Sequence, residues 1–166
     1  MSTARTLVLL RHAKSDYPPG AVDHQRPLAP RGIREAGLAG DWLRAHAPAF
    51  DAVLCSTATR TRQTYARTAL AAPVRYVDDL YDATPGTVIA TINTVAADID
   101  ALLVIGHEPA MSSVALGLAG PGTDAAAAQR ISEKYPTSGI AVLHFAGNWA
   151  EVELRSAALV DFHVPR

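Results

Sequence analysis

Short apolar runs alternate along the chain with longer segments of helical periodicity. Five runs rich in β-branched and other apolar residues predict strands over residues 6–10, 52–55, 74–77, 101–105 and 140–145. The segments between them are long enough to hold helices. Because strands that alternate with helices usually pair in parallel, the pattern predicts an α/β fold, a three-layer sandwich whose mostly parallel central sheet is flanked by helices.

Four segments predict helices, and three of them start with a proline, whose missing N–H is not needed there. Pro30, Pro85 and Pro109 take this position, and the fourth helix covers residues 57–70. Residues 119–128 predict a loop that runs into a further helix. In the helix after Pro30, we expect one stripe of residues to face the sheet: Ile33, Ala36, Gly37, Gly40 and Leu43. Glu35 lies outside this stripe.

The composition is that of an ordinary globular chain. With 166 residues, 49% of them hydrophobic and 19% charged, the chain can bury one core, and we expect a single domain over residues 1–166. Fifteen Lys and Arg residues stand against sixteen Asp and Glu residues. This balance gives no strong field for nucleic acid or an anionic membrane, and neither is predicted as a partner.

The N-terminal segment and the cysteine count bear on location. The apolar run Leu7–Leu10 ends at Arg11 and is too short for a signal peptide or a membrane span. Cys55 is the single cysteine, so no internal disulfide can form. Both observations predict a cytoplasmic protein.

Polar residues follow three of the predicted strands. Arg11 and His12 follow the first, residues 56–60 follow the second, and His107 follows the fourth. In open parallel sheets, ligands collect beyond the carboxyl ends of the strands. The sequence therefore brings two histidines and two arginines, Arg11 and Arg60, to one edge of the sheet.

These residue types together fit phosphoryl transfer. A neutral imidazole can attack phosphorus, and guanidinium groups present a planar fork that matches phosphate oxygens. A metal site is not predicted, because no H-E-x-x-H spacing occurs and Arg11 and Arg60 would repel a cation. We expect no cofactor.

Four stretches, LVLLRHAKS (7–15), RPLAPRG (26–32), CSTATRTRQT (55–64) and VIGHEPAM (104–111), also occur in this order in a known family. On these motifs the sequence resembles the histidine phosphatase superfamily, which includes the phosphoglycerate mutases, and within it the short bacterial SixA-like phosphohistidine phosphatases. The resemblance implies a phosphoglycerate mutase-like fold and a phosphatase that forms a phosphohistidine on its own chain. The substrate would be a phosphorylated protein, carrying phosphohistidine, or a small phosphorylated molecule.

The resemblance also implies roles for individual residues. His12 would be the nucleophile, and three residues would complete the phosphate pocket: Arg11, Arg60 and His107. Arg26 would be a fifth contact, and Lys14 and Ser15 lie in the same loop as further candidates for substrate binding.

The proton donor is where the sequence departs from the family pattern. Larger members use a glutamate to protonate the leaving oxygen, but no glutamate occurs between Glu35 and Glu108. Near the third strand the acids are Asp78, Asp79 and Asp82, of which Asp82 is the candidate donor. An alkoxide needs a proton to leave, whereas an imidazole can already carry its own. A weak or missing acid therefore favours phosphohistidine as substrate.

Alternative interpretations remain open at the level of sequence. A small-molecule phosphomonoesterase or mutase on the same fold is the first, and a non-catalytic phosphate-binding module is the second. A cysteine nucleophile is disfavoured, because four residues separate Cys55 from Arg60 and six separate it from Arg62, where a tyrosine-phosphatase loop needs five. The physiological substrate and the role of residues 121–137 are not determined.

Overall fold

A computed structural model describes residues 4–166. Its centre is a sheet of six strands in the order β3-β2-β4-β1-β5-β6. The first four strands in chain order run parallel, and β5 runs antiparallel to both β1 and β6. The strands are β1 (Arg5–Arg11), β2 (Ala52–Ser56), β3 (Val74–Val77), β4 (Ala101–Gly106), β5 (Ile140–Phe145) and β6 (Ala158–His163).

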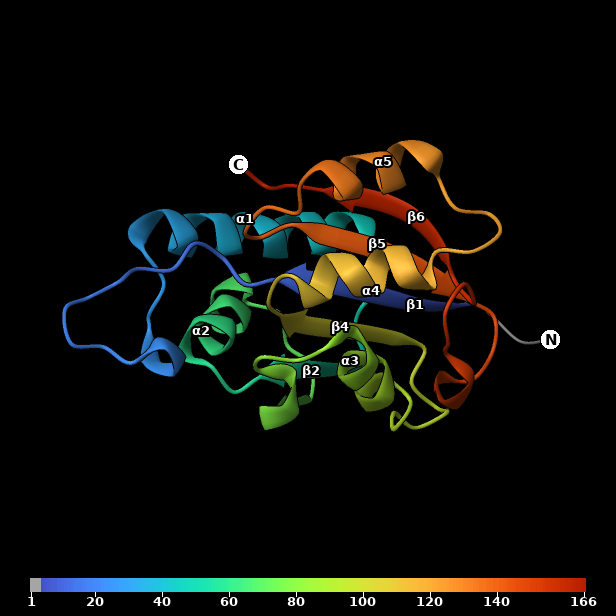
Figure 1. Cartoon of the computed structure of the whole chain (residues 1–166), viewed down its shortest axis with the longest axis horizontal. Helices are drawn as coiled ribbons and strands as arrows, with labels where there is room; N and C mark the ends of the chain where they lie inside the picture. The colour runs from blue at the N-terminus through green and yellow to red at the C-terminus, as the bar shows by residue number, and fades with distance from the viewer. Residues whose placement is uncertain (1–3) are drawn as a thin grey trace.

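Within residues 4–166, five helices form the two outer layers, which Figure 1 shows on either face of the sheet. One layer consists of α1 (Pro30–His46) and α2 (Thr59–Thr68). The other consists of α3 (Pro85–Ile92), α4 (Ala110–Leu118) and α5 (Ala125–Glu133). The predicted three-layer α/β architecture with a mostly parallel sheet is confirmed.

The parallel strands are apolar on both faces because both faces are covered. In β1, Leu7 and Leu9 pack toward α3, α4 and α5, whereas Val8 and Leu10 pack toward α1 and α2. β4 follows the same alternation and is fully buried. This double burial explains why these strands read as continuous apolar runs in the sequence.

The sixth strand, β6, was not among the predicted elements. It pairs with β5 alone and forms one edge of the sheet, so one side of it has no neighbouring strand. Leu159 and Phe162 are buried and Asp161 is exposed, and the pairing with β5 is irregular between Val142 and Leu143, so the burial along β6 follows no simple alternation. A mixed sequence of this kind gives a weak strand signal, because edge strands are only half buried.

The prediction for the inner stripe of α1 was wrong at two positions. Ile33 is 37% exposed, and Glu35 is buried with 1% exposure. The Glu35 carboxylate forms ion pairs with Arg31 Nε at 3.3 Å and with Arg166 Nη1 at 3.2 Å, which offset the cost of burying its charge. At Gly40 an added Cβ would lie 2.1 Å from the carbonyl oxygen of Thr68, so glycine lets α1 lie directly against the end of α2.

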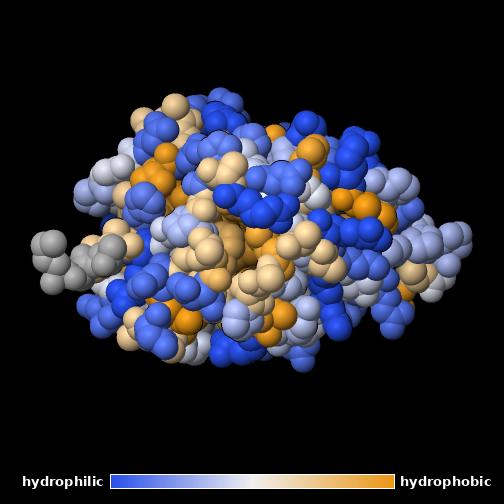
Figure 2. Space-filling view, turned by 180° about the vertical axis from the view of Figure 1, so that it is seen from behind, coloured by the Kyte–Doolittle hydropathy of each residue, from blue (hydrophilic) through white to orange (hydrophobic). Residues whose placement is uncertain are grey.

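A long loop, residues 12–29, extends past the carboxyl ends of the parallel strands and contains a 3-10 turn at Asp23–Gln25 (Figure 1). Two more 3-10 turns lie at Asp78–Leu80 and Trp149–Glu151. From behind, the surface is a mosaic of hydrophilic and small apolar areas, hollowed near the middle (Figure 2). Within residues 4–166, no helix has the length and apolarity needed to cross a membrane.

Candidate active site

The main chain of Arg11, His12 and Ala13 is fixed from three sides. His12 N donates to the carbonyl oxygen of Gly106 at the end of β4 (3.0 Å), and His12 O accepts from the N–H of Ser138 (3.1 Å). The N–H of Ala13 donates to Thr64 Oγ1 on α2 at 2.9 Å. The main chain around His12 is therefore held rigidly, as the accurate placement of a reactive group requires.

His12 is buried, with 7% exposure, and its tautomer follows from its contacts. Its Nδ1 lies 2.7 Å from the carbonyl oxygen of Ala13, which can only accept, so Nδ1 donates its hydrogen. A neutral ring then carries its lone pair on Nε2. Burial, assisted by the neighbouring His107 and two arginines, lowers the pKa of His12 to about 3, so the ring is neutral at physiological pH.

His107 lies beside His12, with 5.3 Å between ring centroids and a tilt of 55°. Its Nε2 lies 2.8 Å from Ser56 Oγ at the end of β2, and that oxygen also accepts the N–H of Ala58 at 3.3 Å. Burial is the main cause that lowers the pKa of His107 to about 4. Strands β1, β2 and β4 thus contribute to one site, as their common edge predicted.

The two candidate phosphate ligands Arg11 and Arg60 are anchored in the same way. Arg11 Nη1 donates to the carbonyl oxygen of Tyr135 at 2.9 Å, and Arg60 Nη1 donates to the carbonyl oxygen of Asp23 at 2.8 Å. Arg11 is held through Nη1 and Arg60 through both Nη1 and Nη2, so the remaining N–H groups keep a fixed direction.

Three buried donor or acceptor atoms in this cluster find no hydrogen-bond partner among the described residues: Arg11 Nε, Arg60 Nε and His107 Nδ1. Buried polar groups are nearly always paired, so such atoms point to a ligand. A phosphoryl group has three terminal oxygens and can accept from guanidinium and imidazole N–H groups. The arrangement around His12 therefore fits an anion of this kind.

The candidates in the loop take different positions. Arg26 donates from Nη1 to Asp23 Oδ1 (2.9 Å), contacts Ser15 Oγ with Nη2, and lies 3.6 Å from the centre of the Tyr17 ring. Ser15 is buried beneath it. The Lys14 side chain is exposed and forms no hydrogen bond or ion pair within residues 4–166. Arg26 and Ser15 belong to the rim of the site, and no contact links Lys14 to it.

Asp23 was not among the residues predicted from the sequence. Its Oδ2 accepts from Arg60 Nη2 at 3.1 Å and from the hydroxyl of Tyr81, and its Oδ1 accepts from Arg26. Hydrogen bonds from Tyr81 and Arg26, and the charge of Arg60, hold the pKa of Asp23 well below its usual range. Its position three residues before the Arg-Pro-Leu segment was the only available signal.

Asp82, the predicted proton donor, is exposed and has a left-handed backbone with φ 53°. In the part of the chain that the structure describes, its side chain forms no hydrogen bond or ion pair. Its neighbour Tyr81 reaches the site instead, with its ring edge-on to His107 at 5.5 Å. Donation by Asp82 therefore has no support from the geometry.

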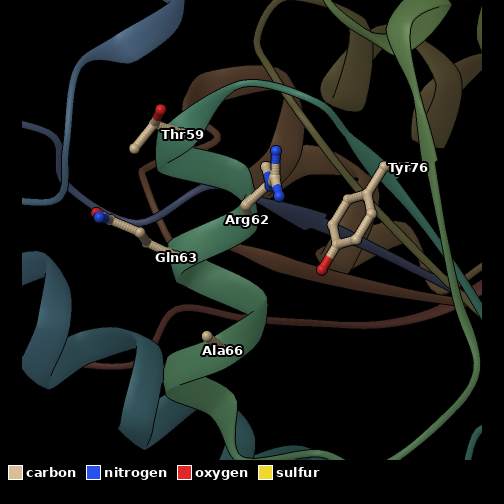
Figure 3. Close-up of a pocket in the computed structure, with 5 residues that line it drawn as sticks. All are labelled: Thr59, Arg62, Gln63, Ala66 and Tyr76. Atoms are coloured by element: carbon tan, nitrogen blue, oxygen red, sulfur yellow. The ribbon is translucent and has the colours of Figure 1, made fainter.

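Two alternatives weighed in the sequence are explained by the fold. Arg62 lies on the outer side of α2, where its guanidinium covers the Tyr76 ring at 4.8 Å and lines a surface pocket with Thr59, Gln63, Ala66 and Tyr76 (Figure 3). Cys55 is fully buried in β2, and burial raises the pKa of its thiol to about 12, so it is unsuited as a nucleophile. Within residues 4–166 no three His, Cys, Asp or Glu side chains are grouped as a metal site needs.

Known proteins resemble this chain in sequence and in fold. The family model of the histidine phosphatase superfamily (branch 1) matches residues 7–99. A Mycobacterium tuberculosis protein, Rv1276c, is 67% identical over 158 residues, which cover 95% of this chain and all of the relative.

Two solved structures share the whole fold. The proposed phosphohistidine phosphatase SixA of Nakamurella multipartitia is 39% identical with a TM-score of 0.91, covering 99% of this chain and 98% of the other. The proposed phosphohistidine phosphatase SixA of Agrobacterium tumefaciens is 30% identical with a TM-score of 0.78, covering 97% and 99%. With the four motifs placed at one edge of the sheet, the chain belongs to the histidine phosphatase superfamily, as a SixA-like phosphatase with the phosphoglycerate mutase-like fold.

Proposed function

We propose that this phosphatase hydrolyses phosphohistidine on proteins, with His12 as nucleophile and Arg11, Arg60 and His107 as the phosphate pocket. The observation that carries the proposal is the state of His12. Its Nδ1–H is bound to the Ala13 carbonyl, its ring is neutral, and its lone pair on Nε2 is available beside two arginines and a second histidine. The similar SixA proteins support the substrate class.

In the first step, Nε2 of His12 attacks the phosphorus atom in line with the bond that breaks. The new P–N bond forms as the bond to the leaving group breaks, and the leaving group takes the electron pair. Arg11 and Arg60 offset the charge on the phosphoryl oxygens. Ser56 Oγ accepts the N–H of Ala58, so we assign its own hydroxyl hydrogen to the bond with His107 Nε2. In this tautomer, Nδ1 of His107 carries a hydrogen that it can donate to a phosphoryl oxygen.

In the second step, water attacks the phosphorus of the phosphorylated His12. The P–N bond breaks, its electron pair returns to Nε2, and both water protons leave with the phosphate as dihydrogen phosphate, so His12 is neutral again. The chemistry needs no metal, because the guanidinium groups supply the positive charge. The single domain over residues 1–166, the cytoplasmic location and the lack of nucleic-acid or membrane partners remain predictions of the sequence.

A small-molecule phosphomonoesterase on the same fold is the second candidate, favoured by one observation. Arg26 and Tyr17 at the rim form a cation–π pair that can bind a compact charged molecule as well as a peptide. The proposed function and this candidate differ in the leaving group that the site accepts.

The test compares kcat/KM for a phosphohistidine peptide with kcat/KM for p-nitrophenyl phosphate. We expect a ratio well above one, and a ratio well below one would support the phosphomonoesterase. Phosphate binding without turnover on either substrate would instead indicate a non-catalytic module.

The role of His12 is tested in the same assay with His12→Asn, which keeps a polar N–H group near the place of Nδ1 but removes the nucleophilic Nε2. We expect a loss of at least about 10³-fold on both substrates. In the wild type, rapid quenching with labelled substrate should trap an acid-labile phosphoryl group on the chain, absent from the variant. Near-normal turnover of a folded His12→Asn protein would disprove the assignment.

A further inference from the structure

We propose that Asp23 sets the leaving-group specificity of the site: its carboxylate accepts the ring N–H of a substrate phosphohistidine and so favours imidazole over an alkoxide as leaving group. The proposal rests on the proposed function, because it names the residue that recognises the phosphohistidine ring. It adds a role for a residue that the four motifs do not contain.

The Asp23 carboxylate is held firmly. Arg26 Nη1 donates to Oδ1 at 2.9 Å, Arg60 Nη2 donates to Oδ2 at 3.1 Å, and the Tyr81 hydroxyl donates to Oδ2 as well. The main-chain oxygen of the same residue accepts from Arg60 Nη1. A carboxylate fixed by so many donors is preorganised, so it loses little freedom when it binds a further N–H.

Asp23 stands where the leaving group departs. The side chain of Asp23 is 52% exposed, whereas that of its partner Arg60 is 9% exposed, so Asp23 forms the solvent side of the arginine pocket. His12 lies at the buried side. Because the leaving group is displaced in line, on the side of phosphorus opposite to the buried His12, we place it on the solvent side of the pocket, where Asp23 lies.

The charge on Asp23 determines what it can do there. Its arginine and tyrosine partners keep it ionised, so it accepts hydrogen bonds and has no proton to give. An alkoxide leaving group would need that proton. An ionised carboxylate at this point therefore gives no help to a phosphate ester of high leaving-group pKa.

With phosphohistidine as substrate, the same carboxylate assists the departure of the leaving group. A hydrogen bond to the distal ring N–H favours the protonated ring, as a carboxylate does for any histidine that donates to it. The P–N bond of the substrate then breaks as the bond from His12 Nε2 forms. Its electron pair goes to the proximal nitrogen, the proton stays on the distal nitrogen, and a neutral imidazole leaves.

The experiment measures kcat/KM on a phosphohistidine peptide and on an alkyl phosphate for the wild type, Asp23→Asn and Asp82→Asn. The Asp23→Asn substitution keeps an acceptor oxygen and the size of the side chain but removes the charge. We expect it to lower the ratio of the two kcat/KM values about tenfold or more, the size of one charge-assisted hydrogen bond. Asp82→Asn, an equal change of charge at an exposed residue, should leave the ratio within about twofold.

The outcomes separate the two proposals. Equal losses on both substrates in Asp23→Asn would overturn the inference and leave Asp23 a positioning residue for Arg60. A ratio below one in the wild type would overturn the proposed function itself. Tyr81→Phe, which removes one donor and keeps the charge, serves as a second variant if Asp23→Asn unfolds. It should keep the ratio within about threefold, because the carboxylate remains ionised by its two arginines, and a tenfold change would contradict the role of charge.

Discussion

The site has two halves that are built differently. The strand-end half consists of Arg11, His12, Arg60 and His107, which come from β1, α2 and the end of β4. The loop half consists of Asp23 and Arg26, in the segment beyond the strand ends. His12 is 7% and His107 9% exposed, whereas the side chain of Asp23 is 52% exposed and that of Arg26 is 13% exposed.

The difference assigns separate tasks to the two halves. Groups that react with phosphorus must keep one geometry, and the main chain of His12 and Ala13 is held by hydrogen bonds with Gly106 O, Ser138 N and Thr64 Oγ1. Groups that recognise the rest of the substrate can stand on a loop, which accepts changes in sequence without loss of the core. We therefore assign the reaction at phosphorus to the strand-end half and the choice of leaving group to the loop half.

The largest effect that would sharpen this comparison is expected at Arg60. Arg60→Lys keeps the positive charge but cannot hold Asp23 through two nitrogens and still offer an N–H to phosphate. We expect kcat/KM to fall about 10²–10³-fold on both a phosphohistidine peptide and a phosphate ester.

The matched control is Arg62→Lys, two residues along the same helix, where the guanidinium lies over Tyr76. It should change kcat/KM by less than about twofold, since surface contacts of this kind contribute little. If the two variants lose activity equally, the assignment of Arg60 to the strand-end half is wrong.

A smaller effect is expected at Arg26, in the loop half. Arg26→Ala removes one of the donors to Asp23 and the stacking on Tyr17, but leaves the contact of Asp23 with Arg60 in place. We expect a loss of about tenfold, mainly through a higher KM. A loss in kcat as large as that of Arg60→Lys would mean that the two halves are not distinct in function.

The smallest effect concerns stability in acid. Burial lowers the pKa of His12 to about 3 and that of His107 to about 4 from 6.5, so the unfolded chain binds more protons below pH 6.5. Stability should therefore fall as the pH drops from 6.5 toward 4. Asp23, whose pKa is lowered from 3.8, starts to contribute only below about that pH.

Urea unfolding between pH 6.5 and 4.5 separates these contributions. His12→Gln should give a shallower decline than the wild type, whereas Asp23→Asn should leave the slope in this range unchanged. An unchanged slope in His12→Gln would mean that His12 titrates alike in the folded and unfolded chain.

The strand-end half was predictable because its signals are local. Buried parallel strands are continuous apolar runs, and the residues that follow them meet at one edge whatever their separation along the chain. His12 and His107 could therefore be paired from sequence, and the Cα register of Arg11 opposite Gly106 agrees with it.

The residues of the loop half were harder to predict from the sequence, for a physical reason. Arg26 could be singled out by its motif, but nothing marks Asp23 except its place three residues before that motif, and the sequence suggested Asp82, near the third strand, as the proton donor. Tyr81 and Asp23, 58 residues apart, meet only because the 3-10 turns at Asp23–Gln25 and Asp78–Leu80 are brought together.

Glu35 and the edge strand β6 show the same limit. The carboxylate of Glu35 is buried because Arg166, at the far end of the chain, supplies a charge to it, and no local pattern contains that information. The sequence by itself determined the layers, the parallel strands and the four residues at their ends, since these follow from periodicity and from the geometry of a sheet. Only the tertiary structure decided which carboxylate contacts the arginines, because contacts between loops depend on the packing of the whole chain.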